Sequence, residues 1–558
     1  MSRLSYEQQE IRLRRPLEPP AETLAPAPTT RRRGMLSAPA VFTAAFLTLA
    51  TLLVLRNWAL FSVVINEGGD SGANSILVLR AKDFDQLVGN YSRLGFNHPG
   101  PAFLYVQAFG EWLLHDLLHV VPSPWNGQTV ALLVLNAALL AGALAVLGSW
   151  LRSWTAIGLA GAVLVGYAAT APDPVIAGTW MPLLYFPPFL LLLTAAASVA
   201  AGRADHLWVL GLAGGLLVHG HAEFLFFVPL IAGAAVAALI RRRRSEPASI
   251  TRRAWLPLAG VLAVFTFPIL VSLVVHWPGE FGKYLSYGSS SQAGGHTPWS
   301  SALYVVRFWP GEHPLTQSIV AVGSWTAAVV LTSRLPDGPA RRYLRAALGI
   351  AGLATALFAV YAQFGIDHLA ETYIGFFSYA LPLLVITVVV LAAGESLRVR
   401  APRPAAPRLV AAGAAIALVA GLLAAGNAPT LATPRYDNVP ELAAAMPSVI
   451  AWAAGQPLVL ELRGDSPLPD PTPLLLAGKR SATRICVRDP WWTWIVTKEL
   501  VCTDEEVATG KQALLSAPGD VPASSTTVAD LGRFVLSVST PPAQRHRPAR
   551  APLPPGRL

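Results

Sequence analysis

Charged residues are scarce in this chain of 558 residues. Only 13% of the residues are Asp, Glu, Lys or Arg, against about 25% in ordinary soluble domains. Hydrophobic residues make up 53% of the sequence, and the mean hydropathy is +0.48. This composition excludes an ordinary soluble globular protein and predicts a polytopic membrane protein.

Cysteine and lysine are scarce as well. The two cysteines, Cys486 and Cys502, exclude a disulfide-rich scaffold and the four-cysteine zinc sites. The 42 Lys and Arg residues exceed the 32 Asp and Glu residues and give a net charge of +10, although only five of them are lysine. Because most of these cations flank apolar runs, we interpret the charge as a sign of membrane topology and expect no nucleic-acid partner.

The first 34 residues carry arginine clusters among prolines. No apolar segment of signal-peptide length follows closely, so we expect no cleavable signal and a basic, disordered tail over residues 1–34. The arginines precede the first apolar run. The positive-inside rule therefore places this tail in the cytoplasm and the loop after the first run outside.

Residues 35–426 contain eleven apolar runs that we predict to span the membrane as helices. Alternation from a cytoplasmic start places the arginine-rich connections inside, which supports the count. The runs are 37–55, 128–150, 154–171, 181–201, 207–218, 222–240, 254–275, 317–332, 346–364, 373–393 and 409–425. The expected fold class is an all-α polytopic membrane domain.

A further apolar segment, residues 99–121, carries two histidines and two acidic residues in its second half. We predict an amphipathic helix lying at the membrane interface. In the rival topology this segment spans the membrane and residues 207–240 form one helix of about 51 Å, against a hydrocarbon core of about 30 Å. Two short helices broken at His219-Gly220-His221 are the more economical interpretation.

The composition changes after residue 426 to charged residues, prolines and short β-rich runs such as Pro457–Leu462 and Arg533–Val538. We therefore predict a small soluble α/β domain over residues 430–540, which the topology places outside the membrane. The basic, proline-rich residues 541–558 are expected to be disordered.

The two cysteines fall in this outer domain, where oxidation is possible. A disulfide between Cys486 and Cys502 would stabilise the domain by roughly 3 kcal/mol. The alternative is a pair of buried cysteines that are not bonded to each other.

The first outward loop, residues 66–98, holds the candidate catalytic groups. Glu67 and Asp70 follow the first span among three glycines, which permit close approach of a ligand to the backbone. A carboxylate there can act as a general base on an acceptor hydroxyl or hold a cation. Alternatively, Asp70 only caps the helix expected from Asn74 to Lys82.

The same loop contains basic residues, against the usual charge asymmetry of membrane proteins. A phosphate at the membrane surface is their expected counter-charge. Alternatively, His98 only caps the helix that follows. The candidate substrate-binding residues of the loop are Arg80, Lys82, Asp85, Arg93 and His98.

His219, His221 and Glu223 lie at the break between two apolar helices on the outward side. Ionisable groups at membrane depth usually face a cavity. The three side chains form either part of a substrate site, a metal site with tight ligand spacing, or a plain helical turn. A divalent cation is therefore possible, and we predict no other cofactor.

Two further outward loops add candidates. His296 lies in the loop of residues 277–314, which either closes over a substrate or is a plain connector. Asp367 and His368 lie in the last short outward loop, where they complete a polar rim or only solvate a turn.

This arrangement resembles the GT-C superfamily of integral-membrane glycosyltransferases, in the branch that contains the lipid A aminoarabinose transferases and the protein O-mannosyltransferases. Those families have a carboxylate just after the first span and a Lys-Pro-Pro or His-Pro-Pro motif before a juxtamembrane helix. Asp70 and the run Asn97-His98-Pro99-Gly100-Pro101 occupy those places. The resemblance covers residues 38–240. Here a glycine separates the two prolines, and Glu67 and Asp70 replace the adjacent Asp-Glu pair of the O-mannosyltransferases.

The resemblance implies transfer of a sugar from a polyprenyl-phosphate donor to a glycan, glycolipid or protein acceptor on the outer face of the membrane. It assigns the base to Asp70 and the donor phosphate to His98 and a loop arginine. We predict a multi-pass protein of the bacterial plasma membrane. The excess of arginine over lysine fits a GC-rich bacterial genome, but codon bias explains it without any bearing on function. The alternatives are a flippase or other transporter of lipid-linked saccharides, and a cell-envelope scaffold protein.

Overall fold

The computed structural model describes residues 37–245, 252–289, 295–400, 405–427, 438–464 and 469–539. The predicted tails, residues 1–34 and 541–558, lie outside the described residues.

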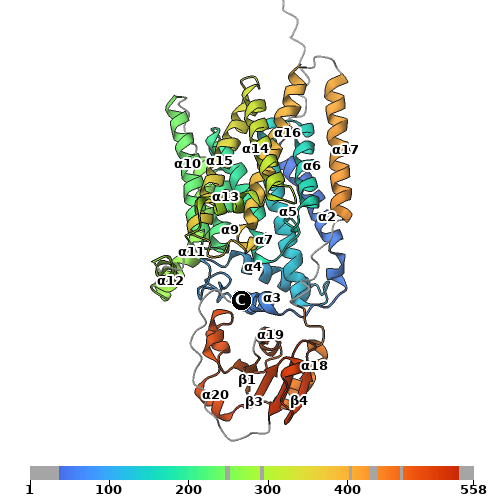
Figure 1. The fold of residues 1–558 in the computed structure, drawn as a ribbon, viewed down its shortest axis with the longest axis vertical. Helices are drawn as coiled ribbons and strands as arrows, with labels where there is room; N and C mark the ends of the chain where they lie inside the picture. The colour runs from blue at the N-terminus through green and yellow to red at the C-terminus, as the bar shows by residue number, and fades with distance from the viewer. Residues whose placement is uncertain are drawn as a thin grey trace, which may run out of the picture. The chain divides into compact units, whose positions relative to one another are not determined.

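Each apolar run predicted to span the membrane folds into helix, the conformation that satisfies backbone polar groups within one segment. Among the described residues, eight helices are long and apolar enough to cross a membrane. They are α2 (Ala38–Arg56), α5 (Pro124–Leu151), α7 (Met181–Leu184) with α8 (Phe186–Ala200), α10 (Phe224–Ser245), α11 (Arg252–Val275), α14 (Pro314–Ser333), α15 (Pro339–Phe364), and η5 (Thr372–Tyr379) with α16 (Ala380–Arg400) (Figure 1). The remaining three predicted spans are α6 (Trp154–Thr170), α9 (Leu207–Gly220) and α17 (Ala405–Asn427), whose apolar parts are shorter.

Helix α8 lies at the centre of the bundle, where it packs against α5, α9, α10 and α15. Its most apolar stretch is 94% buried, whereas that of α11 is 6% buried. The exposed residues of α11 include Val264, Phe267 and Val274. Because α11 is apolar on all sides and yet exposed, we expect its exposed surface to face lipid.

The predicted helix break at His219-Gly220-His221 is confirmed. Helix α9 ends at Gly220 and α10 begins at Phe224. The single helix over residues 207–240 of the rival topology is therefore wrong.

Residues 99–121 form α4 (Ala102–Gly110) and a π-helical segment, η3 (Glu111–Leu117), instead of one regular helix. Phe109 and Trp112 are exposed, whereas Glu111 is buried and its Oε1 lies 2.8 Å from Nζ of Lys82. Apolar residues on the outside and a paired carboxylate on the inside fit the amphipathic helix that the sequence predicted.

The segment connecting the spans near α4 also contains α3 (Gly69–Lys82), which begins five residues before the expected Asn74. The loop of residues 277–314 is not a plain connector, because it forms α12 (Gly279–Ser289) and α13 (Pro298–Val306).

The C-terminal region folds as the predicted α/β domain. Its five strands are ordered β2-β1-β3-β5-β4, with β1 parallel to β2 and β3, and β5 antiparallel to β3 and β4. Leucines of strands β1 and β3 pack with those of α19 in one core. The elements are α18 (Leu442–Ala453), β1 (Leu458–Arg463), α19 (Thr472–Arg480), β2 (Ile485–Val487), α20 (Asp504–Thr509), β3 (Lys511–Ser516), β4 (Ser525–Asp530) and β5 (Val535–Ser539).

Helix α19 of this domain packs directly on α3. The backbone N–H of Gly69 donates to Oδ2 of Asp470 at 2.6 Å, and Nη2 of Arg480 lies 2.6 Å from Oε1 of Glu67. Ile76 of α3 belongs to the apolar core of the domain. The C-terminal domain therefore fixes the start of the helix that carries Asp70.

A disulfide joins Cys486 of β2 to Cys502, with an S–S distance of 2.06 Å. Beside it, Arg484 forms a two-point ion pair with Glu506, through Nε to Oε1 at 2.5 Å and Nη2 to Oε2 at 2.9 Å. The hydrogen bonds from Arg484 lower the pKa of Glu506 to about 2. The unfolded-state value is about 4.3.

Replacing Glu506 by Gln should therefore have a pH-dependent effect on stability. The pKa is lower in the folded protein, so the pair stabilises fully above about pH 4.5 and progressively less as the pH falls toward 2. We expect a loss of about 1 kcal/mol at pH 7, because solvent screens this partly exposed pair. The free energy of unfolding of the full-length wild type and variant, measured in detergent, should differ above about pH 4.5. This difference should become smaller as the pH falls toward 2. A difference independent of pH would contradict the assignment.

Candidate functional site

A cavity of about 430 Å³ lies where several segments of the chain that connect helices meet. Its lining residues come from the start of α3, the loop of residues 90–98, the start of α7, the turn between α9 and α10, α12, and the segment of residues 361–374. Of the candidates named from the sequence, the cavity brings together Asp70, Arg93, His98, His221, Glu223 and Asp367.

Asp70 lies in the first turn of α3 with its carboxylate held by two aromatic residues. The hydroxyl of Tyr91 donates to Oδ1, and Nε1 of Trp180 donates to Oδ2 at 2.9 Å. The N-cap of α3 is Gly68, and no side chain caps the helix. The expectation that Asp70 caps this helix is therefore wrong. Because this carboxylate lies half-buried at the cavity wall, it is placed to accept a proton from a hydroxyl bound in the cavity.

Arg93 is the one Lys or Arg among the residues described as lining the cavity. Its Nη2 lies 2.8 and 2.9 Å from the two carboxylate oxygens of Asp367, and Nη1 lies 2.9 Å from Oε1 of Glu371. Arginine presents its donors in a planar fork that matches carboxylate and phosphate equally well. The guanidinium of Arg93 is thus paired with two carboxylates, those of Asp367 and Glu371, from the segment between α15 and η5.

His98 and His221 stack in the cavity with ring centroids 4.0 Å apart. Burial, with a smaller contribution from His221, lowers the pKa of His98 well below its usual value. Its Nδ1 accepts from the backbone N–H of Ala222 at 3.2 Å, which assigns the ring proton to Nε2. At neutral pH, His98 is therefore an uncharged hydrogen-bond donor and no cation for a phosphate.

The carboxylate of Glu223 is buried beside this pair. Its Oε1 lies 3.7 Å from Nδ1 of His221, and its side chain is hydrogen-bonded to Tyr361 of α15. Glu223 thus belongs to a polar floor of the cavity built from the turn before α10.

Aromatic residues form much of the cavity wall, and no local sequence pattern predicted that they come together. Tyr284 and Tyr287 of α12 pack edge-on against Phe96, with ring centroids 5.0 and 6.1 Å away. The sequence analysis did not predict α12, because its glycines and serines are typical of a loop. Aromatic faces suit the apolar faces of sugar rings. The aromatic lining residues are Tyr91, Phe96, Trp180, Tyr185, Tyr284, Tyr287, Tyr361 and Tyr373.

Four candidates from the first loop lie elsewhere. Glu67 is buried and bonded to Arg480 of the C-terminal domain, so its charge is neutralised away from the cavity. Arg80 pairs with Asp85 at 3.1 Å. Lys82 pairs with Glu111 at 2.8 Å and with Asp116 at 2.6 Å. The pairs of Lys82 connect the C-terminal end of α3 to η3, and the Arg80 pair connects α3 to the residues that follow it. The charges of these residues therefore have a structural role.

The three remaining histidine candidates also lie outside the lining residues. His219 is buried with Nε2 2.6 Å from the carbonyl oxygen of Phe265. His296 bonds the carbonyl oxygen of Ile366 at 2.9 Å, and His368 is exposed. In the described part of the chain, no group of three or more His, Cys, Asp or Glu side chains is arranged to hold a metal ion.

Comparison with known proteins shows a likeness in fold. No family model and no curated protein matches the sequence. The crystal structure of ArnT from Cupriavidus metallidurans bound to undecaprenyl phosphate is 12% identical, with a TM-score of 0.53 over 89% of this chain and 98% of that chain. The structure of the same protein in the apo state is 14% identical, with a TM-score of 0.52 over 90% and 98% of the two chains. The chain therefore has the fold of these ArnT structures.

Proposed function

We propose that this protein is a membrane glycosyltransferase that moves a sugar from a polyprenyl-phosphate donor to a cell-envelope glycan, glycolipid or protein acceptor. The observation that carries the proposal is the cavity itself, in which the carboxylate of Asp70 and the guanidinium of Arg93 line one aromatic-walled space. The ArnT fold supports it, since that protein binds undecaprenyl phosphate in a solved structure.

In the proposed reaction, Asp70 accepts the proton of the acceptor hydroxyl. The hydroxyl oxygen forms the new bond to the anomeric carbon of the sugar, while the bond from that carbon to the phosphate oxygen breaks. The polyprenyl phosphate leaves with the electron pair. Tyr91 and Trp180 fix the Asp70 carboxylate, so little reorganisation is needed when the proton moves.

The donor phosphate has a place at Arg93. Two phosphate oxygens can replace the carboxylate oxygens of Asp367 on Nη2 and of Glu371 on Nη1, because phosphate and carboxylate both fit the guanidinium fork. His98 can donate from Nε2 as a neutral group. The aromatic wall would then pack against the sugar and exclude water from the anomeric carbon.

Replacing Arg93 by Gln should weaken binding of undecaprenyl phosphate by roughly tenfold or more, since a charge-assisted contact contributes about 1.5 to 3 kcal/mol. Binding to purified full-length protein in detergent measures this. Arg80→Gln is the matched control, because Arg80 pairs with Asp85 outside the cavity. Equal affinity in wild type and Arg93→Gln would remove Arg93 from the donor site.

The activity itself is tested by incubating the purified protein with polyprenyl-phosphate sugars and membrane extracts. Transfer of labelled sugar to a lipid, glycan or protein fraction is expected. Tight donor binding with transbilayer movement but no transfer would instead support a flippase.

A further inference from the structure

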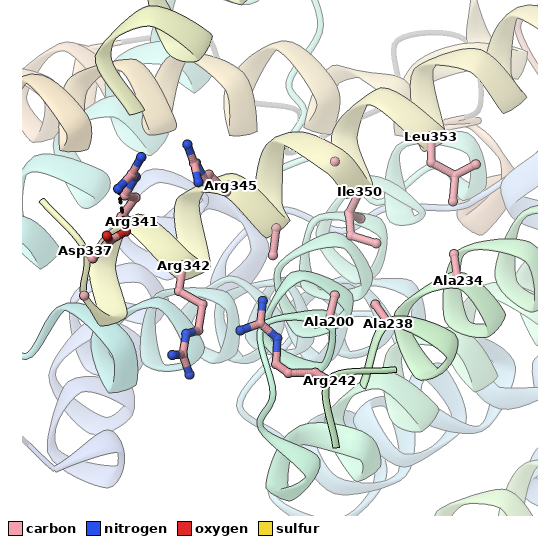
Figure 2. Close-up of a pocket in the computed structure, with 13 residues that line it drawn as sticks. Ala200, Ala234, Ala238, Arg242, Asp337, Arg341, Arg342, Arg345, Ile350 and Leu353 are labelled. Carbon is pink, nitrogen blue, oxygen red and sulfur yellow. Dashed lines mark hydrogen bonds and ion pairs between the residues drawn. The ribbon is translucent and has the colours of Figure 1, made fainter. Parts of the chain in front are cut away.

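A second cavity, of about 630 Å³, lies among α8, α10 and α15. Four arginines and Asp337 line one end of it, and apolar residues and glycines line the rest (Figure 2). The basic lining residues are Arg242 of α10 and Arg341, Arg342 and Arg345 of α15. We call these residues and their surroundings the arginine cavity.

The arginine cavity lies at the end of the bundle opposite the candidate active site. Glu223, just before α10, lines the first cavity, whereas Arg242, near the end of α10, lines the second. On α15 the order is reversed, with Arg341 near the start and Tyr361 near the end. Nineteen residues of helix rise by about 30 Å, which is the thickness of the hydrocarbon core. The arginine cavity therefore opens at the other surface of the membrane.

Positive charge in the arginine cavity is incompletely neutralised. Asp337 is the one carboxylate among its lining residues, and its Oδ1 pairs with Nη1 of Arg341 at 2.5 Å. The side chains of Arg342 and Arg345 are exposed and make no hydrogen bond or ion pair with another residue in the described ranges. An anion entering the cavity thus meets two guanidinium groups that no described carboxylate occupies, beside Arg242.

The apolar wall runs from the arginines toward the middle of the helices. Ala234 and Ala238 precede Arg242 at helical spacing on α10, so the three share one face. Across from them, Ile350 and Leu353 follow the arginines along α15, as Figure 2 shows. A Cβ added at Gly349 would meet nothing within 4 Å, so small residues leave this groove open.

We propose that the arginine cavity binds an anionic phospholipid of the membrane leaflet that it faces. The phosphate would lie among Arg242, Arg342 and Arg345, and an acyl chain would lie along the groove past Gly349. The apolar groove favours a lipid over free phosphate. A zwitterionic lipid fits less well, because its ammonium group would find Asp337 already paired.

The first test titrates purified full-length protein in detergent with phosphatidylglycerol or phosphatidylcholine and counts bound lipids by native mass spectrometry. Phosphatidylglycerol should bind more tightly. The double variant Arg342→Gln/Arg345→Gln should bind it roughly tenfold or more weakly, because each basic residue at a lipid headgroup contributes to affinity. Arg334→Gln is the matched control, since Arg334 is exposed and lies outside the cavity lining.

The second test fills the groove. Gly349→Leu should reduce binding of phosphatidylglycerol while leaving the unfolding midpoint without lipid at or above the wild-type value, because leucine favours helix more than glycine. Gly260→Leu on α11 is its control, as a Cβ there also meets nothing within 4 Å. Unchanged binding in both the arginine double variant and Gly349→Leu would overturn the proposal.

Two competitors decide between ligands. Displacement of phosphatidylglycerol by inorganic phosphate at similar concentration would overturn a lipid site and leave a phosphate site. Displacement by undecaprenyl phosphate at lower concentration than by phosphatidylglycerol itself would overturn the choice of a phospholipid. Retention of phosphatidylglycerol against both competitors supports the proposal.

Discussion

Replacing Asp70 by Asn should lower turnover by about 10² to 10⁴-fold while expression and donor affinity stay near wild type. Asn keeps the size of the side chain and one oxygen, which can still accept one of the two hydrogen bonds that Tyr91 and Trp180 donate to Asp70. It cannot accept the proton of an acceptor hydroxyl. The helix should be unaffected, because α3 is capped at Gly68 with no side-chain bond from Asp70. Initial rates of sugar transfer, with donor binding measured separately, test this.

The control for Asp70→Asn is Asp85→Asn, which removes an exposed carboxylate of the same region. Its turnover should equal that of the wild type. A large loss in Asp85→Asn, or in Glu67→Gln without loss of folding, together with normal turnover in Asp70→Asn would move the base to that residue. Normal turnover in all three would remove this loop from the chemistry.

The second large effect concerns the attachment of the C-terminal domain. Replacing Arg480 by Met leaves Glu67 buried, only 1% exposed, with no counter-charge. Loss of one partner from a buried ion pair costs about 3 to 5 kcal/mol. Because Glu67 directly precedes the glycines that start α3, we expect the domain to detach from α3. Denaturant unfolding of the full chain in detergent and limited proteolysis of the C-terminal domain measure the loss.

The neighbouring residue provides a matched control. Lys479 pairs with the partly exposed Glu499, so Lys479→Met should cost at most about 1 kcal/mol. The double variant Glu67→Gln/Arg480→Met removes the buried charge together with its partner and should recover part of the stability. Equal losses for Lys479→Met and Arg480→Met would show that the buried pair has no special importance.

Local sequence features predicted the architecture well. Apolar runs predicted the membrane-spanning helices, and the polar residues within one apolar stretch predicted the break between α9 and α10. The change in composition gave the C-terminal domain. Asp70, Arg93 and His98 were recognised as candidates because their residue types stand out in an outward loop, and the cavity brings all three to its wall.

Long-range pairing was beyond local patterns. Glu67 looked like a second catalytic carboxylate, but its partner Arg480 lies 413 residues away in sequence. Arg93 forms an ion pair with Asp367, which lies 274 residues away in sequence. Local periodicity contains no information on such pairs. An acidic or basic residue that forms a distant ion pair has the same local sequence pattern as one that is free to bind a ligand. The aromatic wall was missed for the same reason, as each ring comes from a different segment.

The pairing of Arg93 with Asp367 and Glu371 has a consequence for the end of a catalytic cycle. In a lipid-phosphate transferase, the donor is a phosphodiester with one negative charge, and the departing polyprenyl phosphate is a monoester with up to two. A bare arginine would hold this product more tightly than the substrate and slow its escape. In the proposed reaction, the carboxylates of Asp367 and Glu371 would compete with the departing phosphate for the same guanidinium. We therefore expect the two carboxylates to help release the product lipid and to neutralise Arg93 again in the empty site.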